Sequence, residues 1–326
     1  MVKIALLGAG KIVQEALTAL REVPQMEAVA IFTRPQSRAK AEKLAAKWHI
    51  PRIYTDYEAM LTAEDADFFY VGLANHVHYA YARRALQHGR HVIMEKPFAP
   101  TATEIRELAD LAREKGLCLI EAVTPFFLPN YEVVREALPH LGRIRAVQAN
   151  YSQYSSRYDR YLAGEVLPVF DPEKCGGALY DINIYNLNLL AGLFGRPQAM
   201  HYMANTGYNG IDTSGVAVLR YKDFFATAVG AKDSASPGFF LVQGETGWLR
   251  VDGAPNEMPA VTLSYGGRTW QVQKNRYAHR MVHEFQRMAE IYESHDLAAV
   301  QRGLSRSVLV GEIVDGLRQS AAMSQP

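Results

Sequence analysis

The pattern of apolar and polar positions in the first 123 residues predicts alternating strands and helices. The apolar run 2–7 is followed by a segment that places Val13, Ala16, Leu17 and Leu20 on one helical face. Further strands are expected at 28–33, 66–73, around Val92 and at 117–120, with helices at 37–48, 79–87 and 101–115. This alternation predicts a doubly wound parallel sheet.

The pattern changes after Pro125. We expect a strand at 144–154, helices near 130–138, 178–194, 279–294 and 297–320, and several extended segments between 198 and 272 joined by short turns. Closely spaced strands with short connections indicate an antiparallel sheet. The sequence therefore predicts an α/β protein. We expect residues 1–123 to form the doubly wound domain and residues 124–326 to form an α+β domain with a large, mostly antiparallel, open-faced sheet.

The predicted antiparallel sheet carries more apolar residues than one packed face needs. They are Phe224, Phe225, Val229, Phe239, Phe240, Leu241 and Val242. A second covered face predicts a homodimer or homotetramer formed through this sheet. The alternative is a monomer that buries these residues against its own helices.

Composition narrows the class of protein. Hydrophobic residues make up 48% of the 326 residues, and 35 basic residues nearly balance 34 acidic ones, which argues against disorder and against nucleic-acid or membrane-surface binding. No apolar run approaches the length of a membrane span, and the N-terminus does not resemble a signal peptide. The widely separated Cys118 and Cys175 favour a reducing compartment. We expect a cytoplasmic protein that acts on a small molecule.

A glycine turn, Gly8-Ala9-Gly10-Lys11-Ile12, directly follows the first strand. Gly8 permits a tight turn, and Gly10 lets the backbone approach a pyrophosphate at the N-terminus of the following helix. Val13 occupies the position of the usual third glycine. The turn predicts that residues 1–123 are a dinucleotide-binding Rossmann domain, which leaves residues 124–326 for substrate binding and oligomerisation. The alternative is a structural turn that binds no nucleotide.

The end of the second strand bears on the choice of cofactor. An NAD site calls for an acidic residue about 20 positions beyond the glycines. The segment Thr33-Arg34-Pro35-Gln36-Ser37-Arg38 contains no acid, and arginine pairs well with phosphate. We predict NADP over NAD, with Arg34 and Arg38 on the 2′-phosphate and Thr33 or Ser37 assisting. The alternative is that these charges are merely solvated at a helix start.

A lysine ends the apolar run that begins at His91. Pro97 cannot donate to a sheet ladder, so the strand stops at Glu95-Lys96-Pro97. Lys96 thus lies at the carboxyl end of an inner strand, where open α/β sheets bind ligands. An ammonium group there is costly to desolvate unless it has a partner or a task. Lys96 is therefore a candidate catalytic and binding residue.

Two polar residues mark the helix predicted at 178–194. Asp181 and Tyr185 are four positions apart and share one face, with Asn188 near the same stripe. The apolar stripe opposite should face the core; it consists of Leu179, Ile182, Leu189, Leu190 and Leu193. The helix alone is consistent with a structural role for the polar pair. Together with Lys96 and the glycine turn, a catalytic role is favoured.

The glycine turn, Glu95-Lys96-Pro97 and the segment 176–185 together resemble the Gfo/Idh/MocA oxidoreductases over essentially the whole chain. Tyr185, where many members have histidine, and Asp171-Pro172-Glu173 resemble the branch of dimeric dihydrodiol dehydrogenases and NADP-dependent xylose dehydrogenases. The resemblance implies a cis peptide at Lys96–Pro97. It also implies cofactor contacts from Ala74, Asn75, His78, Glu95 and Lys96. Leu73-Ala74-Asn75 departs from the usual Thr-Pro-Asn.

The implied reaction moves a hydride between a carbinol carbon and a nicotinamide ring. Tyrosine has an ordinary pKa of about 10, and a nearby ammonium group favours the phenolate. Our hypothesis makes Tyr185 the general acid/base and lets Lys96 tune it and polarise the substrate oxygen. Asp181 would orient Lys96 or a second substrate hydroxyl. The alternative assigns the base to Lys96 itself.

Aromatic residues suggest the class of substrate. An aromatic wall suits a sugar ring or an aromatic diol. We expect substrate contacts from Phe126 and Arg157, with Phe127, Tyr151, Tyr154, Tyr158 and Phe170 nearby. His76 and His78, and His279 and His283, have metal-like spacing without a convincing third ligand, so no metal is expected. The sequence predicts an oxidoreductase for a sugar, cyclic polyol or dihydrodiol. The alternatives are a non-catalytic nucleotide-bound regulator and an NAD-assisted glycoside-cleaving enzyme.

Overall fold

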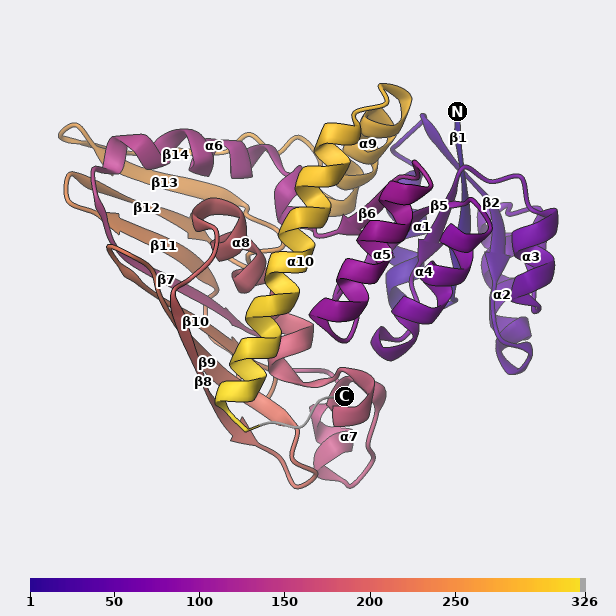
Figure 1. The fold of residues 1–326 in the computed structure, drawn as a ribbon, viewed down its shortest axis with the longest axis horizontal. Coiled ribbons are helices and arrows are strands. Elements are labelled where there is room, and N and C mark those ends of the chain that lie inside the picture. Colours follow the sequence, from indigo (N-terminus) through magenta and orange to yellow (C-terminus); the bar gives the residue numbers. More distant parts are fainter. Residues whose placement is uncertain (323–326) are drawn as a thin grey trace. The chain divides into compact units, whose positions relative to one another are not determined.

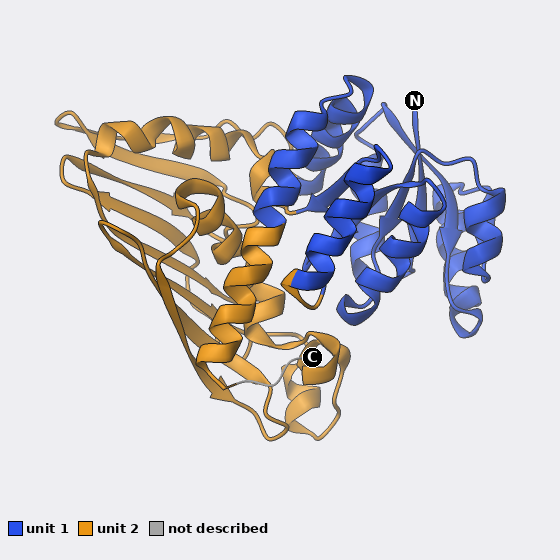
Figure 2. Ribbon diagram, viewed as in Figure 1, with its two compact units in different colours: residues 1–99, 103–122, 279–307 blue, residues 100–102, 123–278, 308–326 orange. Residues whose placement is uncertain are grey.

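The computed structural model describes residues 1–322, and the chain divides into two compact units (Figure 1, Figure 2). Unit 1 comprises residues 1–99, 103–122 and 279–307; unit 2 comprises 100–102, 123–278 and the chain from 308 onward. The division differs from two consecutive domains, 1–123 and 124–326, because residues 279–307 belong to unit 1. Helix α9 (Arg280–Glu293) packs on α1 (Lys11–Leu20) there, and Arg280 forms an ion pair with Glu15 at 2.8 Å.

Unit 1 contains a six-stranded parallel sheet in the order β3-β2-β1-β4-β5-β6, which confirms the doubly wound prediction. The strands are β1 Val2–Leu7, β2 Met26–Phe32, β3 Arg52–Tyr54, β4 Phe68–Val71, β5 His91–Glu95 and β6 Leu119–Ala122. The other helices of this part of the chain are α2 Arg38–Trp48, α3 Tyr57–Ala63, α4 His78–Gln87 and α5 Ala102–Glu114. The sequence did not predict β3 and α3, which are too short to show a clear periodicity.

Unit 2 contains an eight-stranded sheet in the order β14-β13-β12-β11-β7-β10-β9-β8. Its strands are β7 Ile144–Ser152, β8 Ala199–Thr206, β9 Asp212–Arg220, β10 Phe225–Ala231, β11 Phe239–Gly244, β12 Gly247–Asp252, β13 Ala260–Tyr265 and β14 Arg268–Val272. Its pairs are antiparallel except for β7 with β10, which confirms the mostly antiparallel prediction. Its helices are α6 Pro129–Ala137, α7 Tyr158–Leu162, α8 Ile184–Phe194 and the part of α10 (Leu297–Ser320) beyond Ser307.

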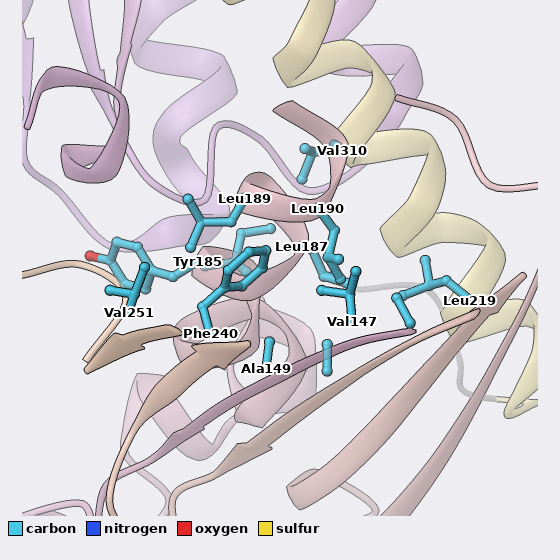
Figure 3. Packing of buried hydrophobic residues seen from close by; sticks show 14 of the residues in the cluster. Val147, Ala149, Tyr185, Leu187, Leu189, Leu190, Leu219, Phe240, Val251 and Val310 are labelled. Carbon is cyan, nitrogen blue, oxygen red and sulfur yellow. The ribbon is translucent and has the colours of Figure 1, made fainter. Parts of the chain in front are cut away.

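One face of the eight-stranded sheet packs against α6, α8 and α10 (Figure 1). Figure 3 shows Leu187 and Leu190 of α8 stacked over Val147, with Phe240 beside them. Each fully buried side chain of this kind stabilises the fold by roughly 1.5–3 kcal/mol. The core of unit 2 therefore lies between this sheet face and α8.

Helix α8 is buried on all sides, which corrects the expected pairing of one polar stripe with one apolar stripe. Every residue from Ile184 to Ala191 is buried. The amide of Asn186 donates to the Val229 carbonyl at 2.9 Å, and that of Asn188 donates to the Ile184 carbonyl at 3.0 Å. These asparagines satisfy backbone carbonyls inside the core, so Asn188 shares no solvent-facing stripe with Asp181.

The opposite face of the sheet carries apolar side chains among polar ones and is partly exposed. Side chains alternate along β10 and β11, so Phe225, Val229, Phe239 and Leu241 lie on this outer face, while Phe240 and Val242 are in the core. Phe225 is 47% exposed. Three members of the predicted apolar set therefore belong to the packed side, because Phe224 also packs against the core and stacks on Tyr221.

A buried carboxylate anchors the helical element that ends in α8. The element begins with a π-helical segment, Leu179–Asn183, that runs directly into α8. Asp212 is 1% exposed, and its Oδ2 accepts hydrogen bonds from the Leu179 amide at 2.7 Å and the Tyr202 hydroxyl at 2.8 Å. Gly177 has φ +94°, and any Cβ at this position would collide with the Asp212 carboxylate. Because Gly177 has no side chain, the backbone before the π-helical segment can lie against the Asp212 carboxylate.

The buried carboxyl group of Asp212 should make the stability of the protein depend on pH. Burial raises the pKa of Asp212 to about 6, above its ordinary value of 3.8. The folded protein thus holds this proton more tightly than the unfolded chain. The resulting stabilisation is complete below about pH 4 and is lost as the pH rises through about 6, by about 3 kcal/mol in all. We expect Asp212→Asn to remove this dependence, so that the wild type loses about 1 kcal/mol relative to the variant between about pH 5 and 7.5.

Urea unfolding of both proteins across this pH range measures the difference in the free energy of unfolding. Asp223→Asn, in the exposed turn between β9 and β10, is the matched control and should follow the wild-type profile. Parallel pH profiles for wild type and Asp212→Asn would contradict the proposed cost of ionising the buried carboxyl group.

Candidate active site

The glycine turn of unit 1 has the geometry of a phosphate-binding loop. Gly8 has φ +112°, and a Cβ there would lie 2.6 Å from the Gly72 carbonyl oxygen, so the turn requires glycine. Gly10 precedes α1, and a Cβ on it would meet no atom within 4 Å. Open space at the first amides of a helix suits a pyrophosphate. The turn therefore fits the diphosphate of a dinucleotide.

Val13 is accommodated by a glycine on the neighbouring strand connection. Its side chain is fully buried, and a Cβ on Gly72 would lie 2.8 Å from the Val13 Cγ2. Gly72 thus provides the room that a third glycine on α1 would otherwise give. Beside them, Ala9 is buried, Ile12 is half-buried and Lys11 is exposed, with its ammonium 3.7 Å from the Glu15 carboxylate.

The segment after β2 presents arginines and no carboxylate. Thr33 is buried, and its amide donates to the Tyr54 carbonyl at 3.0 Å. Arg34 is exposed at the start of a 3-10 turn that ends at Ser37. Arg38 begins α2 and pairs with Glu42 at 2.9 Å. Arg38 already has a partner on its own helix, which leaves Arg34 as the better candidate for a phosphate.

The turn after β5 holds Lys96 half-buried. The buried Glu95 carboxylate accepts hydrogen bonds from the Tyr70 hydroxyl at 2.6 Å and the Lys96 amide at 3.3 Å. The Lys96–Pro97 peptide is cis, as the family resemblance implied. The ring nitrogens of His78 lie 2.9 Å from the Pro97 carbonyl oxygen and 3.2 Å from that of Leu73. Burial lowers the pKa of His78, so its neutral ring donates to one carbonyl and braces this turn.

Sequence reasoning missed a cluster of buried carboxyl groups near Glu95. Glu284 on α9 is 1% exposed, and burial together with the neighbouring Glu95 and Glu121 raises its pKa well above the ordinary value. Arg280 opposes this shift. The signal in the sequence was a glutamate on the apolar face of α9, between Val282 and Phe285. Burial raises the pKa of Glu95 as well, so this part of unit 1 disfavours additional negative charge.

Tyr185 and Asp181 lie on the anchored element of unit 2. Asp181 is in the π-helical segment, and Tyr185 is in the first turn of α8. Tyr185 is 8% exposed, its ring lies 5.8 Å from that of Tyr151, and Figure 3 shows its hydroxyl pointing away from the aliphatic cluster. Single π-helical turns occur often at functional sites. The ring of Tyr185 therefore packs in the core of unit 2, and its hydroxyl lies at the edge of this core.

Asp181 has a partner that the sequence analysis missed. Lys232 is 2% exposed, and its ammonium nitrogen lies 2.7 Å from the Asp181 Oδ2. A signal was present, because the apolar run of β10 stops at a lysine just as the run of β5 stops at Lys96. The same reasoning that selected Lys96 therefore applies to Lys232.

The predicted substrate contacts fall into separate environments within unit 2. Phe126 packs against the core, with its ring 4.9 Å from that of Tyr131. Arg157 is exposed just before α7. Tyr158 and Phe170 join a small cluster around Tyr161. Tyr151 is the predicted aromatic residue with a ring contact to Tyr185.

Two general findings concern residues 1–322. No helix in this range combines the length and the hydropathy that a bilayer span requires. The same residues contain no group of three or more histidine, cysteine, aspartate or glutamate side chains placed to hold a metal ion. His78 instead contacts backbone carbonyls.

Known proteins resemble both halves of the chain. The model of the oxidoreductase family with an NAD-binding Rossmann fold matches residues 2–123, and that of the GFO/IDH/MocA C-terminal domain matches residues 134–250. The scyllo-inositol 2-dehydrogenase (NADP(+)) IolU of Bacillus subtilis is 28% identical over 100% of this chain and 99% of its own. The trans-1,2-dihydrobenzene-1,2-diol dehydrogenase of Sus scrofa is 32% identical over 66% of this chain and 63% of its own.

The fold has a close counterpart among solved structures. KijD10, a 3-ketoreductase from Actinomadura kijaniata in complex with NADP and TDP-benzene, aligns with a TM-score of 0.83 over 98% of this chain and 97% of its own. At 21% identity, this likeness shows the fold. The two family models, the glycine turn and the Glu95-Lys96-Pro97 turn agree, and the chain belongs to the GFO/IDH/MocA family of oxidoreductases.

Proposed function

We propose that this protein is an NADP-dependent dehydrogenase of a cyclic polyol, sugar or dihydrodiol, in which Tyr185 exchanges the proton of the reacting hydroxyl. The observation that carries the proposal is the placement of Tyr185. Its ring is buried, its hydroxyl points away from the aliphatic cluster, and it lies on the same helical element as Asp181. The inositol and dihydrodiol dehydrogenases among its relatives support a substrate with several ring hydroxyls.

The roles of the protein groups follow from their chemistry. When bound, the nicotinamide ring supplies the hydride exchange. Residues 8–12 hold the pyrophosphate through the amides of the α1 N-terminus. In the oxidation direction the Tyr185 phenolate oxygen accepts the proton of the substrate hydroxyl, in the reduction direction the Tyr185 hydroxyl returns it, and the Lys96 ammonium stabilises negative charge on the substrate oxygen. Asp181 accepts a hydrogen bond from the substrate.

Replacement of Tyr185 by phenylalanine tests whether Tyr185 transfers the proton. We expect Tyr185→Phe to lower kcat by about 10²–10⁴-fold, because the general acid/base is lost while the ring packing remains. Affinity for NADPH should stay unchanged. Steady-state oxidation of inositols, aldoses and trans-diols, followed by NADPH absorbance, measures the effect. Tyr208→Phe, which removes the hydroxyl of an exposed tyrosine between β8 and β9, is the matched control.

The competing assignment makes Lys96 the base. It predicts that Tyr185→Phe retains near-normal turnover while Lys96→Met is inactive. That pair of results would transfer the acid/base role from Tyr185 to Lys96.

Cofactor preference should depend on Arg34. We expect Arg34→Asp to weaken NADP binding by roughly 10- to 100-fold and to shift preference toward NAD, because a charge-assisted hydrogen bond to the 2′-phosphate is lost. Arg38→Ala should have a smaller effect, because Arg38 pairs with Glu42. Calorimetric titration with both cofactors measures the ratio of dissociation constants. An unchanged ratio in Arg34→Asp would exclude Arg34 from the phosphate site.

We also propose that a second copy of the chain covers the outer face of the eight-stranded sheet. A stable interface buries about 800 Å² on each partner, and the apolar residues Phe225, Val229, Phe239 and Leu241 of this face supply a centre for one. The double variant Phe225→Glu/Leu241→Glu should sediment as a monomer. Leu162→Glu, at an exposed apolar residue of α7, should leave the assembly intact. A wild type that sediments as a monomer would contradict the proposal.

A further inference from the structure

Glu284 is a buried carboxyl group on the face of α9 that packs inside unit 1. The residue is 1% exposed, and its Oε1 has no hydrogen-bond partner among residues 1–322. The next residue, Phe285, places its ring 5.9 Å from that of Tyr70 on β4. A carboxylate that is buried without a hydrogen bond is costly, and a neutral carboxyl group is far less so. The surroundings of Glu284 therefore favour its protonated form.

The charges around Glu284 balance while Glu284 is neutral. Each of three other carboxylates interacts with a basic group; these pairs are Glu15 of α1 with Arg280 of α9, Glu95 of β5 with Lys96, and Glu121 of β6 with Arg306 of α10. The uncharged groups at the same carboxylates are the hydroxyls of Tyr70, which donates to Glu95 at 2.6 Å, and Ser307, which donates to Glu121 at 2.5 Å. An ionised Glu284 would add a fourth negative charge against three positive ones.

Glu284, and not Glu95, is the acid of this group that keeps a proton. Burial raises the pKa of both side chains, and for Glu284 the negative charge of Glu95 raises it further. Glu95 accepts hydrogen bonds from the Tyr70 hydroxyl and the Lys96 amide, and such bonds favour the ionised form. The buried Oε1 of Glu284 accepts none from the described residues. The proton therefore resides on Glu284.

Glu95 connects this acid to the edge of the sheet that receives the cofactor. A dinucleotide at the switch point of a doubly wound sheet places one half beyond the strands on each side of it. In the proposed function Arg34, after β2, holds the 2′-phosphate of the adenosine half, so the nicotinamide half belongs to the side of β4 and β5. Glu95 is the last residue of β5. The charge of the nicotinamide ring can therefore act on Glu95 and, through the same group of charges, on Glu284.

We propose that binding of NADP⁺ expels the proton of Glu284 into solvent and that binding of NADPH does not. The inference rests on the proposed cofactor site and adds to it a proton-linked discrimination between the two redox forms. The oxidised ring brings one positive charge that the reduced ring lacks, and this charge compensates an ionised Glu284. The O–H bond of the carboxyl group breaks, its electron pair stays on the carboxylate, and the proton passes to water.

The sign of the pH dependence follows from this step. Because the complex with NADP⁺ binds fewer protons than the free protein, affinity for NADP⁺ should rise with pH until Glu284 is ionised in the free protein as well. Affinity for NADPH should lack this contribution. The 2′-phosphate of both cofactors also titrates, with a pKa near about 6, so the ratio of their dissociation constants isolates the effect of the ring.

Calorimetric titration of the full chain with NADP⁺ and with NADPH, in buffers of low and high ionisation enthalpy, counts the protons exchanged. We expect the wild type to release up to about one proton more with NADP⁺ than with NADPH. Its ratio of dissociation constants, NADP⁺ over NADPH, should fall by up to about tenfold per pH unit within the range from about pH 6 to 9.

Two variants assign the proton to Glu284. Glu284→Gln keeps the shape of the protonated acid and cannot ionise, so it should exchange equal numbers of protons with both cofactors and hold a constant ratio of dissociation constants. Glu290→Gln removes an exposed acid of the same helix, which pairs with Arg287 at 2.9 Å, and should behave as the wild type does. Circular dichroism verifies that both variants are folded.

Infrared difference spectroscopy of the wild type gives a second measurement that needs no variant. The C=O band of a protonated carboxyl group should be present with NADPH and lost when NADP⁺ replaces it. Retention of this band, equal proton release with both cofactors, or a pH-dependent ratio that persists in Glu284→Gln would overturn the inference and leave the dehydrogenase proposal standing. A wild type that binds neither form of NADP nor either form of NAD would overturn both.

Discussion

The π-helical segment and α8, which carry Asp181 and Tyr185, are held in place by two buried charges at one end of the β9–β10 pair. The antiparallel register sets Ser214 opposite Ala231, so Asp212 and Lys232 lie at the same end of this strand pair. Asp212 holds the first amide of the π-helical segment, and Lys232 holds Asp181 two residues further along the chain. Neither charge can leave its partner without a large desolvation cost. The position of Tyr185 follows from this pair of constraints.

In each unit, glycines without a side chain let backbone segments approach one another closely beside the candidate site residues. A Cβ on Gly230 of β10 would lie 2.6 Å from the Asn183 Cβ, so the glycine lets the π-helical segment rest directly on the strand. In unit 1, Gly72 gives room to Val13, and Gly8 fits against the Gly72 carbonyl. The glycines therefore fix how closely each helix approaches its sheet, and charged groups then fix the orientation of the side chains.

Much of the fold could be predicted from the sequence, because periodicity is strong in long elements. Apart from β3, α3 and α9, the order of strands and helices in unit 1 agrees with the prediction, as do the bounds of α10, 297–320. The short β3 and the π-helical segment carry no periodic signal. The buried state of Asn186 and Asn188 could not be predicted either, since their partners are backbone carbonyls supplied by the fold. The ion pair between Asp181 and Lys232 joins residues 51 positions apart, a contact that spacing cannot reveal.

The measurement that most directly tests the account is the fate of the carbinol hydrogen. Wild-type protein is incubated with NADP and C-deuterated scyllo-inositol or trans-cyclohexane-1,2-diol, and the reduced cofactor is analysed by mass spectrometry and NMR. The account predicts that NADPH accumulates in step with the ketone product and carries the deuterium at C4 of the nicotinamide ring. Turnover without lasting accumulation of labelled NADPH would contradict assignment of the protein as a dehydrogenase. A lack of any turnover of inositols, aldoses and diols with either cofactor would contradict it too.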